Sequence, residues 1–146
     1  MLPQAKVNEL LNLVKVLVAT GTIDLPDPGL MTQLEVKSED GRESFMIDVN
    51  RRGKIKVTKC TYQERYQVVE ILLRLDVDGP PHENPDGEVI PCPHLHIYKE
   101  GFADKWAYAI NTTDFNNTSD LAMTLVDFLR YCKVRDIPHV RSGLFS

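Results

Sequence analysis

Apolar residues near the N-terminus recur at the spacing of one helix face. Counted from the first of them, they fall at i, i+3, i+4, i+7, i+10 and i+11, which are Val7, Leu10, Leu11, Val14, Leu17 and Val18. A period of about 3.6 residues is typical of an amphipathic helix. The pattern therefore predicts one helix over these positions, ending near Gly21, since glycine often follows the last turn of a helix.

Farther along the chain the period changes to two, as in a half-buried strand. Alternating apolar and polar residues over 33–37 predict a strand, and Asp40-Gly41 predicts the hairpin turn that follows it. Apolar residues two positions apart mark two further strands, with Phe45, Ile47 and Val49 in one, and Ile55 and Val57 in the other. Three consecutive antiparallel strands are expected.

The second half of the chain alternates in the same way. Residues 68–77 predict a strand in which Arg74 and Asp76 point away from the richer apolar face. Residues 78–93 contain five prolines and two glycines, which predicts a long ordered loop instead of a strand or helix. Two short strands joined by a hairpin are expected at 94–98 and 105–110. Residues 118–120 can cap a last helix, which ends before Pro138 and carries Leu121, Leu125, Phe128, Leu129 and Cys132.

The predicted order of elements is a helix, about six strands and a second helix, which is typical of an α+β fold. Consecutive strands with short turns form an antiparallel sheet, and the N-terminal and C-terminal helices should cover its core face. The chain has 146 residues and no internal repeat or linker. We therefore expect residues 1–146 to form a single domain.

Composition excludes several classes of protein. Apolar residues make up 42% and charged residues 26%, and the formal net charge is -4, so the chain is neither disordered nor a polycation that coats nucleic acid. Its three cysteines form no CxxC pair, which argues against a disulfide framework or a thiolate zinc knuckle. No apolar run approaches the roughly 18 residues of a membrane span, and the N-terminus lacks a signal-peptide pattern. The sequence thus predicts a cytoplasmic protein without a membrane partner.

Three of the four histidines, His82, His94 and His96, lie within fifteen residues. On a strand, His94 and His96 share one face with Tyr98, while the residues between them point to the core. If this strand pairs with 68–77, Arg74 lies on the same outer face. We expect the proline-rich loop to hold His82 above the other imidazoles.

This set of side chains matches the needs of a ribonuclease that uses no metal. Such an enzyme requires a base for the 2′-hydroxyl, an acid for the leaving 5′-oxygen, and a cation for the developing charge on the phosphorane. We assign His94 and His96 as the candidate acid and base and Arg74 as the cation, with His82 and Tyr98 assisting. No cofactor is expected.

Two other interpretations of the histidines remain open at this point. They could form a hydrogen-bonded anchor that rigidifies the loop. Alternatively, His-x-His on a strand is a common pair of metal ligands, and His82, Asp76 or Cys92 could supply a third. No HExxH helix and no obvious fourth ligand accompany them.

A basic segment lies within this acidic chain. Residues 50–74 contain seven basic side chains and only two acidic ones. Lysines on one face of a strand, next to tyrosines, can hold phosphates and stack bases. The candidate RNA-binding residues are Arg51, Arg52, Lys54, Lys56 and Arg65. The alternative is a solvated strand face whose lysines protect an edge.

The histidine motifs also resemble a known signature. Arg74-Leu75-Asp76, Pro81-His82 and Pro93-His94-Leu95-His96 are similar to the Arg-x-Asp, Pro-His and Pro-His-x-His motifs of TumE-type toxins of bacterial toxin-antitoxin systems. That resemblance implies an RNase-toxin-like sheet, RNA as the target, an antitoxin as partner, and functional positions at Arg74, Asp76, His82, His94 and His96. The loop between His82 and His94 is longer than in that signature.

The chain as a whole resembles an uncharacterised family of small proteins from Gram-positive bacteria and their prophages. This similarity includes Lys59-Cys60-Thr61-Tyr62, Asn84-Pro85-Asp86-Gly87 and residues 101–108. The leading hypothesis is a metal-independent endoribonuclease of toxin-like or phage-defence type. The rival hypotheses are a prophage-associated regulator or inhibitor that binds a protein without catalysis, and a metal-dependent hydrolase.

Overall fold

The structure, a computed structural model, describes residues 1–53 and 57–142. Within these residues it has two helices, α1 (Gln4–Asn12) and α2 (Leu121–Tyr131). The strands are β1 (Lys15–Leu17), β2 (Ile23–Asp24), β3 (Met31–Ser38), β4 (Ser44–Asn50), β5 (Thr61–Tyr66), β6 (Glu70–Asp76), β7 (His82–Glu83), β8 (Val89–Ile90), β9 (His94–Ile97), β10 (Ala107–Ala109), β11 (Val134–Arg135) and β12 (Val140–Arg141).

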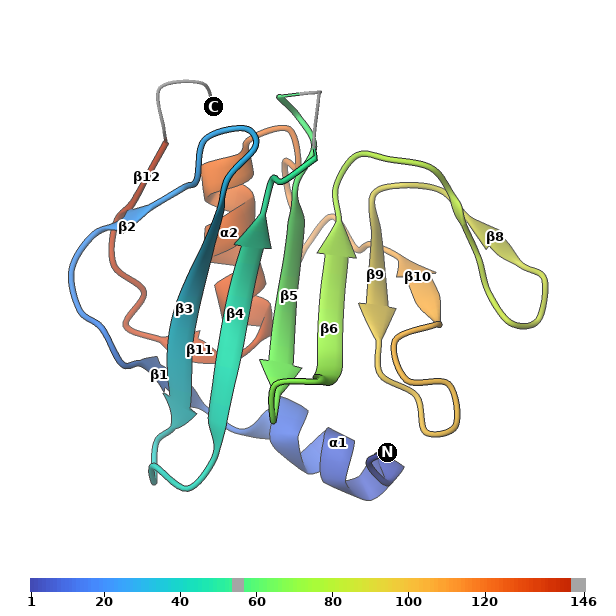
Figure 1. Ribbon diagram of the computed structural model, residues 1–146, viewed down its shortest axis with the longest axis horizontal. Coiled ribbons are helices and arrows are strands. Elements are labelled where there is room, and N and C mark those ends of the chain that lie inside the picture. Colours follow the sequence, from blue (N-terminus) through green and yellow to red (C-terminus); the bar gives the residue numbers. More distant parts are fainter. Residues whose placement is uncertain (54–56, 143–146) are drawn as a thin grey trace.

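A large sheet dominates the fold, in the order β10-β9-β6-β5-β4-β3-β1-β11 (Figure 1). All neighbouring strands are antiparallel except β1 and β11, which are parallel. The predicted α+β class with a mostly antiparallel sheet is confirmed, but among the described residues the sheet has eight strands and not about six. No described helix is both long enough and apolar enough to span a bilayer.

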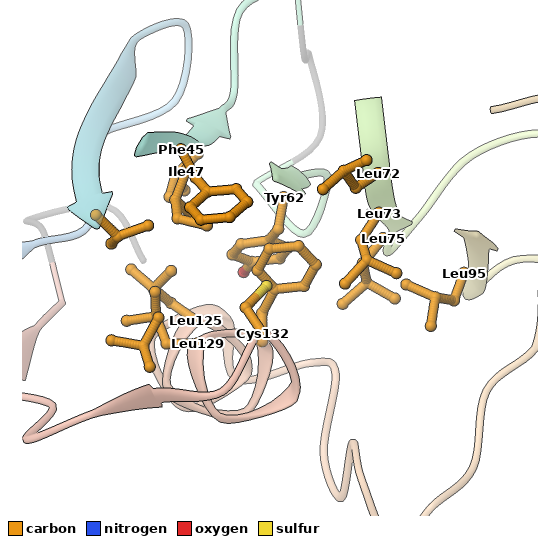
Figure 2. Close-up of a cluster of buried hydrophobic side chains, with 14 of the residues drawn as sticks. Phe45, Ile47, Tyr62, Leu72, Leu73, Leu75, Leu95, Leu125, Leu129 and Cys132 are labelled. Carbon is orange, nitrogen blue, oxygen red and sulfur yellow. The ribbon is translucent and has the colours of Figure 1, made fainter. Parts of the chain in front are cut away.

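The core lies between the sheet and the two helices. In Figure 1, α2 lies behind β3, β4 and β5, and α1 crosses the lower end of the sheet. Asp120 caps α2 as predicted, because its carboxylate accepts a hydrogen bond from the Met123 N–H at 3.0 Å. Figure 2 shows how the inner face of the sheet packs on this helix, with Phe45, Ile47, Tyr62, Leu75, Leu125, Leu129 and Cys132 all buried.

The prediction of the first helix is wrong for the residues that follow Asn12. The helix ends at Asn12, and 15–17 form β1, which pairs with both β3 and β11. Val14, Val16 and Val18 alternate with Lys15 and Leu17, and β-branched residues favour strands. Pairing with the free edge of β3 therefore overrides the weaker helical period.

Three strand predictions also need correction. The last of the three predicted consecutive strands, expected around Ile55 and Val57, lies farther along the chain as β5, at 61–66. Val57 lies in a turn, and Ile55 is outside the described residues. Strand β6 begins at Glu70, because Gln67 and Val68 adopt positive φ and turn the chain, leaving Val69 76% exposed. The proline-rich loop contains a short hairpin, formed by β7 and β8.

The sheet face opposite the core carries polar side chains in two neighbouring rows. One row crosses six strands in register, as Gln33, Asp48, Gln63, Arg74, His96 and Ala107. The next row crosses five strands, as Asn50, Thr61, Asp76, His94 and Ala109. Side chains opposite each other on one face of a sheet lie close together. The register of β6 and β9 thus places an Arg–His and an Asp–His pair side by side.

Candidate functional site

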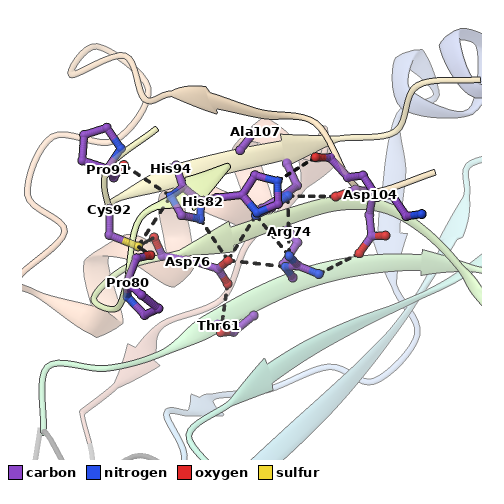
Figure 3. Close-up of polar contacts among 12 residues, drawn as sticks. Thr61, Arg74, Asp76, Pro80, His82, Pro91, Cys92, His94, Asp104 and Ala107 are labelled. Atoms are coloured by element: carbon purple, nitrogen blue, oxygen red, sulfur yellow. Dashed lines mark hydrogen bonds and ion pairs between the residues drawn. The ribbon is translucent and has the colours of Figure 1, made fainter. Parts of the chain in front are cut away.

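Three imidazoles meet above β6 and β9. The ring centroids of His94 and His96 are 4.9 Å apart, and that of His82 is 4.6 Å from His96 and 6.0 Å from His94. His82 comes from β7, which folds back over the sheet (Figure 3). The predicted convergence of these histidines with Arg74 is therefore present in the structure. His94 and His96 are only 2% and 1% exposed, so His82 is the most accessible of the three.

Every imidazole of this cluster has one ring nitrogen against a backbone carbonyl. The pairs are His82 Nε2 with Lys105 O at 2.7 Å, His94 Nδ1 with Pro91 O at 3.3 Å, and His96 Nδ1 with Asp104 O at 2.8 Å. A carbonyl oxygen only accepts hydrogen bonds, so each of these nitrogens is the one that carries a proton. The second nitrogen of each ring is left for another partner.

The second nitrogens of two histidines face one carboxylate oxygen. Asp76 Oδ2 lies 3.2 Å from His94 Nε2 and 3.3 Å from His96 Nε2. Burial acts to raise the pKa of Asp76, but the contact with the His96 ring and the charge of Arg74 outweigh it and lower this pKa to about 2. Asp76 is therefore a carboxylate at neutral pH. Thr61 donates its hydroxyl to the other oxygen, Oδ1, at 3.1 Å.

Arg74 joins the cluster to a second acid. Its Nη1 donates to Asp104 Oδ2 at 2.6 Å, its Nη2 lies 3.1 Å from His96 Nε2, and its Nε lies 3.5 Å from Asp76 Oδ2. These contacts are drawn as dashed lines in Figure 3. The side chain is still 26% exposed. These contacts therefore hold the Arg74 guanidinium in place, although part of the side chain is in contact with solvent.

A cavity of about 250 Å³ opens beside these side chains. Its lining includes all three histidines of the cluster together with Arg74 and Asp76, and it adds Lys59, Thr61, Asp78 and Cys92. Lys59 packs so closely on Gly79 that a Cβ there would lie 3.3 Å from Lys59 Cε. The sequence did not single out Lys59 or Thr61 as site residues, because the third strand was expected at 55–57 and not at 61–66.

Cys92 lies at the rim of the cavity as a protonated thiol. Its Sγ donates to the Asp76 carbonyl oxygen at 3.5 Å, and it lies 3.6 Å from His94 Nδ1. Burial raises the pKa of the Cys92 thiol, and the charge of Asp76 adds to the rise. A thiol held in the neutral form is a poor nucleophile.

Tyr98 does not join the cluster. It is 2% exposed, and its hydroxyl oxygen accepts a hydrogen bond from the Leu2 N–H at 2.9 Å. Tyr98 follows the last residue of β9 and packs in the hydrophobic core, so the alternation that placed it beside His96 does not extend to it. Its contacts tie the N-terminus to the sheet.

The predicted basic surface is only partly present. Arg51 is fully buried, where its Nη1 donates to the Pro26 carbonyl oxygen at 2.9 Å and its Nη2 to that of Val57 at 2.7 Å. This residue links two loops and offers nothing to RNA, so its prediction as an RNA-binding residue is wrong. Arg52 is exposed. Lys54 and Lys56 lie outside the described residues.

Arg65 is occupied by a carboxylate of the neighbouring strand. Its Nη2 donates to Asp48 Oδ1 at 2.9 Å, and its Nε contacts Oδ2. Gln63 and Gln33 donate to the same carboxylate at 2.7 and 3.0 Å. Asp48 is only 3% exposed. This network holds the polar side chains of β3, β4 and β5 in place. It lies on other strands than the histidine cluster.

We expect Asp48→Asn to lower the free energy of unfolding and to make it depend less on pH in the acidic range. Burial raises the pKa of Asp48, but hydrogen bonds from Arg65, Gln63 and Gln33 outweigh it and hold this pKa below the ordinary value of an aspartate. A depressed pKa contributes stability above the unfolded-state value, and that contribution is lost as pH falls through the folded-state value. The variant should lose about 1–3 kcal/mol at pH 7 in urea unfolding and less at pH 3. An equal loss at both pH values would contradict this.

The cluster also has the composition of a metal site. Within the part of the chain that the structure describes, one ligand atom each from Asp76, His94 and His96 lies within 4.8 Å of the others. Two imidazoles and one carboxylate are ligands that zinc and similar ions accept. The structure therefore keeps open the metal interpretation of the His-x-His motif.

Comparison with known proteins gives one match. The model of a family of unknown function (DUF6978) matches residues 2–134. Neither the curated proteins nor the solved structures include a match to the chain.

Proposed function

The chain belongs to this family of unknown function, so its activity must be argued from the site, and we propose that it is a metal-independent endoribonuclease. The observation that carries the proposal is the convergence of His82, His94 and His96 with Arg74 on one open cavity. Acid–base groups and a fixed guanidinium in one place are what cleavage of an RNA phosphodiester needs.

The proposed reaction is attack of the ribose 2′-oxygen on the adjacent phosphorus. The base removes the 2′-hydroxyl proton, the new P–O2′ bond forms, and the P–O5′ bond breaks. The acid protonates the leaving 5′-oxygen, so the products are a 2′,3′-cyclic phosphate and a 5′-hydroxyl. One imidazole must begin neutral and another protonated.

The hydrogen bonds favour a division of roles between the two buried histidines. His96 Nε2 lies between Arg74 Nη2 at 3.1 Å, which only donates, and Asp76 Oδ2 at 3.3 Å; we take the neutral form of His96, in which the lone pair of Nε2 faces Arg74. His94 Nε2 lies 3.2 Å from Asp76 Oδ2, which only accepts hydrogen bonds, so this contact suits a nitrogen that carries a proton. We therefore assign His96 as the base and His94 as the acid, with His82 assisting from the mouth of the cavity.

Two cations serve the phosphate in this proposal. Arg74 approaches the charge that develops on the phosphorane, held by Asp104 at 2.6 Å. Lys59 lines the same cavity and adds a second positive charge to it. The basic strand at Lys54 and Lys56 stays a prediction, as do an antitoxin or other protein partner, the toxin-like or phage-defence role and the prophage origin.

The test is cleavage of a defined RNA by the full chain in the presence of EDTA. The wild type should give fragments that end in a 2′,3′-cyclic phosphate, and the His94→Ala/His96→Ala variant should give none. His139→Ala is the matched control, since this fourth histidine is exposed and outside the cavity lining, and it should cleave like the wild type. Absence of cleavage by the wild type, or equal cleavage by the double variant, contradicts the proposal.

A further inference from the structure

We infer that Asp76, His94 and His96 bind a single divalent transition ion such as Zn²⁺, and that the bound ion switches off the acid–base chemistry of the cavity. The first half of this inference stands on the ligand geometry alone. The second half rests on the proposed function, because the ion would occupy the two nitrogens assigned to proton transfer.

The carboxylate oxygen already lies at a metal-site separation from each of the two imidazoles, and all three ligand atoms lie within 4.8 Å of one another. Asp76 Oδ2 lies 3.2 Å from His94 Nε2 and 3.3 Å from His96 Nε2. Zinc bonds to nitrogen or carboxylate oxygen of about 2.0–2.1 Å in a tetrahedron place neighbouring ligands about 3.3 Å apart. The carboxylate would therefore share an ion with either histidine with little movement of the side chains.

The outer partners of the ligands are also those of a metal site. A histidine that binds a metal usually donates its other ring N–H to a carbonyl or carboxylate, which fixes the tautomer. His94 and His96 do this through Nδ1, to Pro91 O and Asp104 O. Thr61 donates a hydrogen bond to Asp76 Oδ1, while Asp76 Oδ2 faces the histidines. Because both side chains are at least 97% buried, the rings keep this orientation.

The donor set indicates which ion fits. Two imidazoles and one carboxylate suit Zn²⁺, whereas Ca²⁺ and Mg²⁺ prefer oxygen ligands throughout. These three residues leave a fourth coordination position on the side of the cavity that they line. A water molecule from the cavity can complete the tetrahedron.

Arg74 is the competitor of the ion. Its Nη2 lies 3.1 Å from His96 Nε2, so a metal on that nitrogen must displace a positive charge. Binding of the ion would also remove the lone pair of His96 and the Nε2 proton of His94. Metal binding and RNA cleavage are then mutually exclusive, and removal of the Arg74 charge should favour the metal.

Isothermal titration of the EDTA-treated full chain with ZnCl₂ at neutral pH tests the site. We expect one ion per chain. Asp76→Asn and His94→Gln should lower the affinity by at least about 100-fold, since loss of outer partners alone costs 10- to 100-fold. His139→Ala should bind like the wild type. Arg74→Ala should bind at least about tenfold more tightly, a gain that a misfolded variant would not show.

Cleavage of the same RNA with and without added Zn²⁺ separates the two halves of the inference. Stoichiometric inhibition that EDTA reverses supports both halves. No binding, or equal binding by His94→Gln and His139→Ala, overturns the metal site whatever the activity. Zinc binding together with zinc-stimulated cleavage overturns the switch. Zinc binding without cleavage under any condition leaves the metal site standing and refutes the proposed function.

Discussion

Replacing Arg74 by Ala should slow RNA cleavage by about 100- to 1,000-fold, the usual cost of removing one group that stabilises a developing negative charge. The guanidinium is fixed by Asp104 at 2.6 Å and lies 3.1 Å from His96 Nε2, so it is in place before the substrate arrives. Groups that need no reorganisation contribute most to the transition state. The loss should appear in kcat more than in KM, measured with a defined RNA under steady-state conditions.

Arg74→Lys is the matched control for charge. Lysine keeps one positive charge but cannot contact Asp104 and His96 simultaneously, because it lacks the planar fork of arginine. We expect intermediate activity. Thermal unfolding of all three proteins checks that the fold is kept. If Arg74→Ala cleaves at the wild-type rate, or if Arg74→Lys is fully active, the assigned role of this guanidinium is wrong.

The proximity of the histidines could be predicted because successive side chains of a strand point to alternate faces of the sheet. His-x-His places two imidazoles on one face, and any antiparallel neighbour brings its own outer residues beside them. The register of β6 and β9 does this with Arg74 opposite His96 and Asp76 opposite His94. The loop carrying His82 closes over them because its prolines restrict it and its β7–β8 hairpin packs near β10.

Other features depended on tertiary contacts that no local pattern reveals. Segment 14–18 is compatible with a helix as well as a strand, and pairing with β3 and β11 makes it a strand. Arg51 looks like a surface cation, yet the carbonyl oxygens of Pro26 and Val57 give it partners inside the protein. Thr61 joins the site only through its register with Asp76. Long-range pairing decided each of these outcomes.

The charged side chains at the cavity are partly exposed, whereas the charged pair in the core is fully buried. At the cavity, Asp76 and Asp104 both pair with Arg74, and all three side chains keep contact with solvent. Inside the core, Lys15 and Glu64 pair with both side chains 0% exposed. A charge that can reach water can exchange its partner for a substrate or an ion, whereas a fully buried charge cannot. The cavity can therefore change state while the core pair fixes the fold.

Replacing Lys15 by Met should destabilise the protein by about 3–5 kcal/mol, because it leaves Glu64 as a buried charge without its partner. Lys15 Nζ lies 3.3 Å from Glu64 Oε2 and donates to the Cys132 carbonyl oxygen at 2.9 Å. The pair thus joins β1, β5 and the end of α2. Urea unfolding of the wild type and the variant at pH 7 measures the loss.

Lys15→Met/Glu64→Leu is the control that separates charge from packing. Removing both charges should restore most of the lost stability, since apolar pairs often replace buried ion pairs without cost. Burial raises the pKa of Glu64, and Lys15 opposes this rise. The folded protein therefore binds the Glu64 proton more tightly than the unfolded chain does, and the stability that this gives is lost as pH rises through the folded-state pKa. The penalty of the single variant should shrink as pH falls, and a pH-independent penalty, or a double variant no more stable than the single one, would refute this account.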